Sequence, residues 1–286
     1  MNLLTFDIEE WCLYKKEKHS ELDRYLDAIL AKLNDNQLKA TFFCVGEMGR
    51  SFPHVIRKIQ NEGHEIGCHS NFHTWLNKMT EAECREDTHH AIDSLEQCIG
   101  EEVISYRAPA FSIGERNKWA FEILAENGIK MDASVFPAAR DFGGFPSFGH
   151  KTPCIVEYNG TSLKEFPICT TYFMGKEWAY SGGGYFRFFP LVFVEKEMKK
   201  SPYAMCYFHI GDLVRESHGV MSKDAYEAYY KEPGTLSSRY VRYIKSNLGK
   251  KNAFQKMMRL IDDNSFVNLS QADQEIEWSK VPVVTI

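Results

Sequence analysis

Two histidines, His69 and His73, are spaced so that both imidazoles can reach one metal ion. They lie at and just beyond the end of residues 65–69, an apolar stretch that is typical of a short buried strand. The two rings can converge if the chain makes roughly one helical turn after His69. Taken alone, this spacing is weak evidence for a metal site, because it also occurs by chance in cores and on surfaces.

Other predicted strands also end in charged or titratable side chains. The apolar runs at 3–7, 103–107, 129–132 and 203–209 end in Asp7, Arg107, Asp132 and His209. The carboxyl ends of the strands of an α/β barrel converge at one face, where residues from different strands carry the chemistry. Acid, base and metal-ligand types at a single face therefore predict a catalytic site.

The elements that position these residues alternate between strand and helix. Helices are indicated by a helical apolar period after Ser20, by the capping box that begins at Thr80, and by glycines that follow the predicted helices at 63, 100 and 128. This order predicts a parallel sheet with right-handed crossovers. Residues 137–187, rich in Gly, Pro and aromatics, interrupt the order and are interpreted as an insertion or lid.

The remaining organisation is simple. Residues 236–286 are predicted to form C-terminal helices and a last strand, including a strand-like segment at 266–269. No internal repeat or linker divides the chain, so we expect one catalytic domain over residues 1–286. The fold class is predicted as α/β.

Composition excludes several classes of partner. The 286 residues carry a net charge of -5, which offers no basic face for nucleic acid. No apolar run is long enough for a transmembrane helix. The eight cysteines include no Cys-x-x-Cys pair and lie mostly in apolar contexts, so we expect them to be reduced and structural. Together with an N-terminus that lacks a basic start, this predicts a cytoplasmic protein, the alternative being an exported form trimmed of its leader.

The ordered motifs resemble the polysaccharide deacetylase family, carbohydrate esterase family four, over most of the chain. Residues 4–7 resemble its first motif, 69–73 its His-Ser/Thr-x-x-His motif, and 107–111 its Arg-x-x-Pro-Tyr/Phe motif. Asp132 and His209 stand at the positions of the fourth and fifth motifs. Residues 183–190 resemble a subgroup linked to bacterial exopolysaccharide export.

The resemblance implies a distorted, incomplete (β/α) barrel that removes N-acetyl groups from an amino-sugar polysaccharide or oligosaccharide. It implies one divalent ion held by His69, His73 and a carboxylate. Zn²⁺ is the favoured ion, and Co²⁺, Ni²⁺ and Mn²⁺ are the alternatives. The ion would polarise the amide carbonyl and lower the pKa of a bound water. Four residues then receive catalytic roles: Asp7 as general base, Arg107 as the cation that keeps Asp7 ionised, His209 as the acid that protonates the leaving amine, and Asp132 as the group that fixes the His209 tautomer.

The chain departs from the family pattern at two positions. The family's first motif usually has Asp-Asp, the second being a metal ligand, but the second position here is Ile8. In a strand Asp7 and Glu9 share a face, so Glu9 is the predicted substitute, with Glu10 the fallback. Tyr207 replaces the usual leucine of the fifth motif, a minor change.

Substrate contacts are predicted at Pro109, Phe111, Trp75 and Arg187. The backbone around Pro109 to Phe111 can help to hold the oxyanion. Trp75 and Trp11 can stack on a sugar ring, but core packing explains tryptophans equally well. For Arg187 the competing interpretation is loop architecture. Arg107 can alternatively be a structural ion-pair partner of Asp132, and His209 a core histidine.

Two other functions stay open at this point. Relatives of this barrel act on small cyclic amides, and a closed pocket would favour such a substrate over a sugar chain. A catalytically inactive carbohydrate-binding barrel is the alternative from a different class. The expected partner is an N-acetylated carbohydrate; the sugar, its linkage and the oligomeric state are left open by the sequence.

Overall fold

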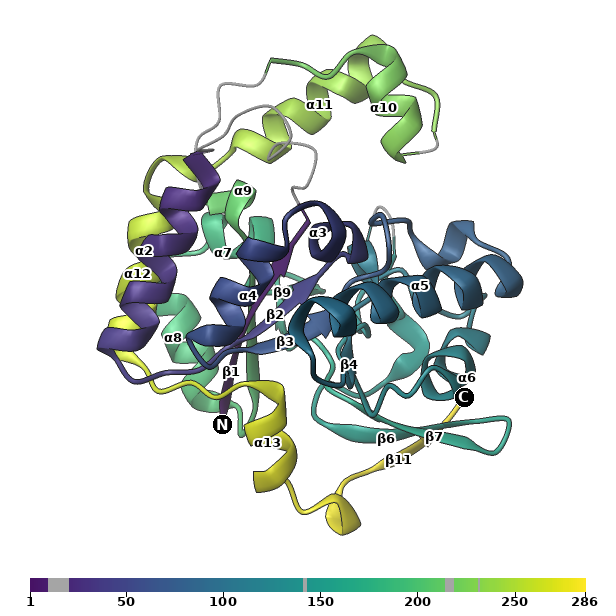
Figure 1. The fold of residues 1–286 in the computed structure, drawn as a ribbon. Helices are drawn as coiled ribbons and strands as arrows, with labels where there is room; N and C mark the ends of the chain where they lie inside the picture. Colours follow the sequence, from purple (N-terminus) through teal and green to yellow (C-terminus); the bar gives the residue numbers. More distant parts are fainter. Residues whose placement is uncertain (10–20, 141–142, 214–218, 231) are drawn as a thin grey trace.

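An open, nine-stranded sheet forms the centre of the molecule (Figure 1). The computed structural model describes residues 1–9, 21–140, 143–213, 219–230 and 232–286. The strand order is β10-β1-β2-β3-β4-β5-β7-β6-β11, and all neighbours are parallel except β6 and β7. Within the described residues the sheet does not close on itself. The predicted α/β class and incomplete barrel are therefore confirmed.

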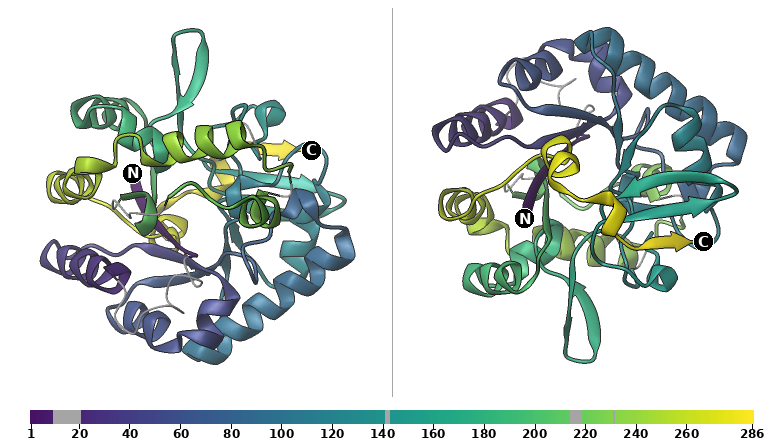
Figure 2. Two further views of the ribbon diagram at one scale, coloured as in Figure 1. Left: turned by 90° about the horizontal axis from the view of Figure 1, so that it is seen from above. Right: turned by 90° about the horizontal axis from the view of Figure 1, so that it is seen from below.

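The strands that end at the site are short. The sheet consists of β1 (Asn2–Ile8), β2 (Thr41–Cys44), β3 (Glu65–Cys68), β4 (Ser105–Tyr106), β5 (Met131–Asp132), β6 (Cys154–Tyr158), β7 (Thr161–Glu165), β10 (Ala204–His209) and β11 (Val283–Thr285). A separate hairpin, β8 (Thr170–Phe173) and β9 (Lys176–Ala179), projects from the body in Figure 2. The five strands expected to end in titratable residues are all present, with ends that differ by one or two residues.

The helices surround the sheet, and most of them cover its outer face (Figure 2). They are α2 (Glu21–Asp35), α3 (Gly46–Ser51), α4 (Pro53–Asn61), α5 (Glu81–Ile99), α6 (Trp119–Glu126), α7 (Gly183–Phe188), α8 (Leu191–Lys200), α9 (Ile210–Leu213), α10 (Lys223–Tyr230), α11 (Leu236–Asn247), α12 (Ala253–Asp263) and α13 (Leu269–Glu275). In Figure 1, α10 and α11 lie above the carboxyl ends of the central strands. They cover the end of the barrel where the sequence places its chemistry.

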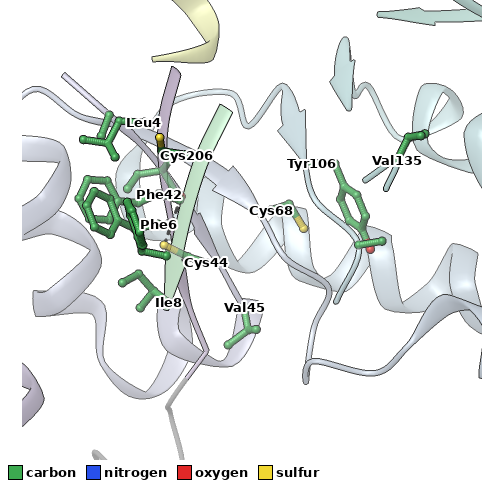
Figure 3. Packing of buried hydrophobic residues seen from close by; sticks show 14 of the residues in the cluster. Leu4, Phe6, Ile8, Phe42, Cys44, Val45, Cys68, Tyr106, Val135 and Cys206 are labelled. Atoms are coloured by element: carbon green, nitrogen blue, oxygen red, sulfur yellow. Dashed lines mark hydrogen bonds between the residues drawn. The ribbon is translucent and has the colours of Figure 1, made fainter. Parts of the chain in front are cut away.

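Alternate residues of β1 pack into two different cores. Phe6 stacks on Phe42 with ring centroids 4.9 Å apart, in the core between the sheet and the outer helices (Figure 3). Leu3 belongs to a second core inside the barrel. Because side chains alternate along a strand, Asp7 points to the same interior side as Leu3. The hydrophobic pattern of β1 thus places a carboxylate inside the barrel.

The helix-end signals are confirmed. Thr80 and Glu83 form the predicted capping box at the start of α5, and Gly100 ends that helix in the left-handed conformation, with φ of 73°. Gly63 follows α4 with φ of 77°. The helix expected after Ser20 is present as α2, whereas Ser20 itself lies outside the described residues.

The strand expected at 266–269 is wrong. Only Val267 bridges to the sheet, opposite Leu3. Asn268 instead caps α13, because its side chain accepts a hydrogen bond from the Gln271 backbone N–H at 2.8 Å. The capping interaction starts a helix where a short apolar run had suggested a strand.

Residues 137–187 contribute to the sheet as well as to loops. They include β6 and β7, which belong to the main sheet, and the β8–β9 hairpin. Among the described residues, no helix has both the length and the apolar character that a bilayer crossing requires.

The described cysteines are buried and free, as expected: Cys44, Cys68, Cys84, Cys98, Cys154, Cys169 and Cys206. Cys12 lies outside the described residues, as do Glu10 and Trp11.

Candidate active site

Glu9, His69 and His73 gather at the carboxyl ends of β1 and β3. The Glu9 Oε2 atom lies 2.6 Å from His73 Nε2 and 3.4 Å from His69 Nε2. One ligand atom from each residue can be chosen so that all three lie within 4.8 Å of one another. Burial raises the pKa of Glu9, but the charges of His73 and His209 outweigh it and hold that pKa well below its usual range. The cluster is therefore a two-histidine, one-carboxylate set.

The donor atoms of this cluster fit a divalent metal ion. His69 Nδ1 lies 2.7 Å from the Arg107 carbonyl oxygen, a contact that assigns the ring proton to Nδ1. The lone pair of His69 then lies on Nε2, which is buried and has no hydrogen-bond partner among the described residues. A carbonyl that fixes the tautomer of a histidine in this way is the usual support for a metal ligand.

His73 reaches the cluster through two left-handed residues rather than through the predicted helical turn. Ser70 has φ of 62° and His73 has φ of 61°. One hydrogen bond from another segment and one within the bend hold it: the Gly46 N–H donates to the Ser70 carbonyl at 2.9 Å, and the Thr74 N–H donates to Ser70 Oγ at 3.1 Å. A Cβ atom on Gly46 would lie 2.7 Å from Ala91 Cα, so this close approach requires glycine. The predicted turn is wrong because these tertiary contacts fix another conformation.

Asp7 and Arg107 form an ion pair inside the barrel. Arg107 Nη1 donates to Asp7 Oδ1 and to Thr5 Oγ1, each at 2.8 Å. The guanidinium also lies 4.3 Å from the centroid of the Phe43 ring. Both charged side chains are almost completely buried. The arrangement leaves Asp7 Oδ2 without a hydrogen-bond donor among the described residues, 3.3 Å from His209 Nε2.

His209 is oriented by Asp212 rather than by the predicted Asp132. Its Nδ1 atom lies 3.2 Å from Asp212 Oδ2, and its Nε2 atom faces Asp7. The parallel pairing of β1 with β10 sets Asp7 directly opposite His209. Asp212 follows in α9, three residues later, a spacing that places it beside His209 on one helical face.

The charges around His209 favour its protonated form. Burial lowers the pKa of His209, but Glu9, Asp212 and Asp7 raise it to about 10. Burial likewise raises the pKa of Asp212, whereas His209 and Arg187 hold it at about 2. An imidazolium at this position is a proton donor.

Asp132 pairs with a second buried carboxyl group instead. It lies on β5 in register with Glu165 on β7, and the two side chains face each other without solvent exposure. Ser134 Oγ donates to Asp132 Oδ1 at 2.5 Å. Burial raises the pKa of both acids, that of Glu165 well above its usual range, so the pair keeps a proton. The predicted role of Asp132 at His209 is wrong because strand pairing directs it to Glu165.

Arg187 contacts Asp212 and the backbone of α11. Its Nη1 atom donates to Asp212 Oδ1 at 2.8 Å and to the Ser246 carbonyl at 3.0 Å, and Nη2 donates to the Lys245 carbonyl at 3.2 Å. The side chain is 5% exposed. The substrate contact predicted for Arg187 is therefore corrected: it connects Asp212 with the C-terminal end of α11.

A cavity of about 320 Å³ opens above these groups. Its lining includes Asp7, Glu9, His73, His209, Asp212, Trp75, Ala110, Phe111, Arg140, Tyr185, Tyr207, Tyr229 and Tyr230. The Tyr229 ring, from α10, is parallel to the His73 ring within 17°, with centroids 5.9 Å apart. Trp75 contacts both Tyr229 and Tyr230 edge to face. The cavity thus has an acidic and imidazole floor and aromatic walls.

The residues predicted to contact the substrate differ in their position relative to the cavity. Trp75 and Phe111 line the cavity. Pro109 is buried beside it, and the neighbouring Ala110 provides the lining. The Phe111 N–H donates to the Ala108 carbonyl at 3.0 Å, so this backbone N–H is already engaged.

Sequence reasoning missed Asp212 and the two tyrosines of α10. The spacing of Asp212 from His209 could have predicted their contact, because an acid three residues after a strand-terminal histidine can face it from a helical turn. Tyr229 and Tyr230 carry none, since aromatic residues in a helix usually indicate core packing.

The first half of the chain matches a known family. Residues 1–131 match the model "Polysaccharide deacetylase", and residues 133–274 match "Domain of unknown function (DUF3473)". A Bacillus cereus peptidoglycan-N-acetylglucosamine deacetylase is 39% identical over 95 residues, 33% of this chain and 34% of that protein. The uncharacterised Bacillus subtilis protein YlxY is 34% identical over 104 residues, 36% of this chain and 32% of that protein. The chain therefore spans about a third of the length of these curated relatives.

Solved structures share the whole fold. A Mycobacterium smegmatis protein classed with the polysaccharide deacetylases has a TM-score of 0.62 at 18% identity, over 100% of this chain and 92% of that one. A Bacillus anthracis pseudoenzyme of carbohydrate esterase family 4 has a TM-score of 0.50 at 13% identity, over 100% and 69%. These structures share the α/β fold with this chain. Over its residues 1–131 the chain is similar to the polysaccharide deacetylase family.

Proposed function

We propose that this protein is a metal-dependent hydrolase that removes N-acetyl groups from an amino-sugar polysaccharide or oligosaccharide. The proposal rests on one observation: Glu9 and His73, which form a cluster with His69, line the same cavity as Asp7 and His209. Zn²⁺ is the proposed ion, since two histidines and a carboxylate are a common catalytic zinc set; Co²⁺, Ni²⁺ and Mn²⁺ are the alternatives. When bound, a divalent ion supplies Lewis-acid polarisation of the amide carbonyl and makes water more acidic.

The protein's own groups account for the proton movements. Asp7 Oδ2 accepts a proton from the attacking water, while Arg107 holds the carboxylate in place. The water oxygen bonds to the carbonyl carbon. His209 Nε2 donates a proton to the amide nitrogen as the C–N bond breaks, with Asp212 keeping Nδ1 engaged. The products are acetate and the free amino sugar.

The aromatic walls support a sugar substrate. Trp75, Tyr229 and Tyr230 present flat apolar surfaces beside a polar floor, which suits the two faces of a pyranose ring. The Bacillus cereus relative is named for an N-acetylglucosamine substrate, which supports the same chemical class. Residues 183–190 resemble the exopolysaccharide-linked subgroup, so an exopolysaccharide is the proposed polymer. The free, buried cysteines support a reducing compartment, and the cytoplasm is the proposed location.

Acetate release tests the function directly. The purified, Zn²⁺-loaded protein is expected to release acetate from N-acetylglucosamine oligomers. Binding of the oligomers without acetate release would favour an inactive carbohydrate-binding barrel, and release from small cyclic amides alone would favour the small-amide hydrolase.

Replacing both His69 and His73 by alanine should abolish stoichiometric metal binding. The two rings supply the nitrogen donors of the cluster, and Glu9 alone is a weak site. Metal content per chain is measured by elemental analysis after gel filtration. The matched control replaces His89 and His90, two exposed histidines on α5, and should keep one ion per chain. Unchanged metal in the His69/His73 variant would contradict the site.

Asp212→Asn should move the alkaline limb of the kcat profile to lower pH, by at least about one unit. Asp212 is one of the groups that raise the pKa of His209 to about 10. A neutral partner removes that support, the pKa falls, and the protonated acid is lost at lower pH. Asp262→Asn, which removes a surface partner of Lys32, is the control and should leave the profile in place. An unshifted limb in Asp212→Asn would show that His209 is not the acid.

A further inference from the structure

Helix α11 presents a broad apolar face to solvent. The helix has no buried residue. Leu236 is 63% exposed, Ile244 and Leu248 are 60% exposed, and Tyr240 and Val241 are about half exposed. At 100° per residue, these side chains and Tyr243 fall within a sector of about 160°, which Ser237 and Asn247 also enter; Leu248 is the residue that follows the helix. Such a face is wide enough to lie on an apolar surface along the whole helix.

The residues of α11 outside the apolar sector make its contacts with the rest of the protein. The Arg242 guanidinium lies 4.7 Å from the centroid of the Tyr230 ring on α10. Arg239 Nη1 donates to the Met221 carbonyl at 2.9 Å, and Arg187 binds the carbonyls at the C-terminal end. In Figure 1, α11 lies at the edge of the molecule, beyond the barrel. The apolar face is thus directed away from α10 and from the cavity that α10 lines.

The same segment concentrates positive charge. Residues 233–252 contain Arg239, Arg242, Lys245, Lys250 and Lys251 and no acidic residue, in a chain whose net charge is -5. On the helical wheel, Lys245 and Arg239 flank the two edges of the apolar sector. An apolar face bordered by basic residues is the pattern of a helix that lies in the interface of an anionic bilayer.

We propose that α11 docks this protein on the surface of an anionic lipid bilayer, with its apolar face in the headgroup region. Charge favours lipid over a second copy of this chain, because two copies would bring two uniformly basic segments together. The cytoplasmic leaflet carries the negative surface potential that such a segment fits. Docking by α11 would hold α10, and with it the cavity, next to the bilayer. The binding measurement needs no substrate, so it stands independently of the deacetylase activity.

Vesicle co-sedimentation tests the proposal. The wild-type protein should bind vesicles that contain phosphatidylglycerol and bind phosphatidylcholine vesicles much less. Ile244→Asp should lower the partition coefficient by about tenfold, since it replaces an inserted side chain by a charge. Val283→Asp is the matched control: Val283 is 54% exposed, lies on β11 at the other end of the molecule, and its variant should bind like wild type.

A second variant tests the charge. Lys251→Gln should weaken binding to the anionic vesicles by about fivefold, and added salt should reduce the difference. All variants should unfold at the wild-type temperature, because none of the substituted side chains is buried. Absence of wild-type binding, or Ile244→Asp binding as tightly as wild type, would overturn the proposal. A wild-type dimer that Ile244→Asp converts to a monomer, without vesicle binding, would assign the face to self-association instead.

Discussion

Asp7→Asn is expected to lower kcat for acetate release by about 10²–10⁴ while metal content stays at one ion per chain. The Asp7 Oδ2 atom lies 3.3 Å from His209 Nε2 and makes no hydrogen bond among the described residues, so it can take a proton from water. Asparagine keeps the shape of the side chain but cannot act as a base. Turnover and metal content are measured on the same preparation, and turnover close to wild type would reject Asp7 as the base.

The same substitution should also reduce thermal stability. Arg107 is completely buried, and asparagine removes its counter-charge; removal of one partner from a buried pair is strongly destabilising. The activity comparison therefore has to be made well below the unfolding temperature of the variant. Asp93→Asn, an exposed change on α5, is the matched control and should alter neither property.

Glu9→Gln should weaken metal affinity by more than about tenfold, whereas Glu10→Gln should change it little. The Glu9 carboxylate lies 2.6 Å from His73 Nε2, within reach of an ion that both histidines bind. A neutral amide oxygen is a poorer ligand for a divalent ion than a carboxylate. Affinity is measured by competition with a chromophoric chelator. The reverse ranking would show that Glu10 is the ligand, and equal small effects would indicate a site completed by water or substrate.

Strand periodicity predicts much of this site. The alternation of β1 places Leu3 and Asp7 on the interior side and Phe6 on the helix side. Extended by two residues, the same alternation brings Glu9 to the face of Asp7, and the structure places its carboxylate beside His73. These relations are local, so the sequence alone carries them.

The partner of His209 could not be predicted in the same way. Asp132 stands at the family's motif position, yet its side chain meets Glu165, because the pairing of β5 with β7 decides where it points. Asp212 meets His209 only because the chain turns into a helix immediately after β10. Which strands pair, and how a strand continues past its end, are tertiary properties that periodicity does not contain.

The boundary between the two matched regions lies near residue 132. It divides the sheet, and it separates the proposed base from the proposed acid along the sequence. Asp7 lies in the first region and His209 in the second, on neighbouring strands. A fragment that ended at this boundary would expose the edge of β1 where β10 now pairs, and it would hold the proposed base without the proposed acid. Recombination between relatives is constrained in the same way. If either half is exchanged, the β1–β10 register must be preserved so that Asp7 and His209 lie opposite each other.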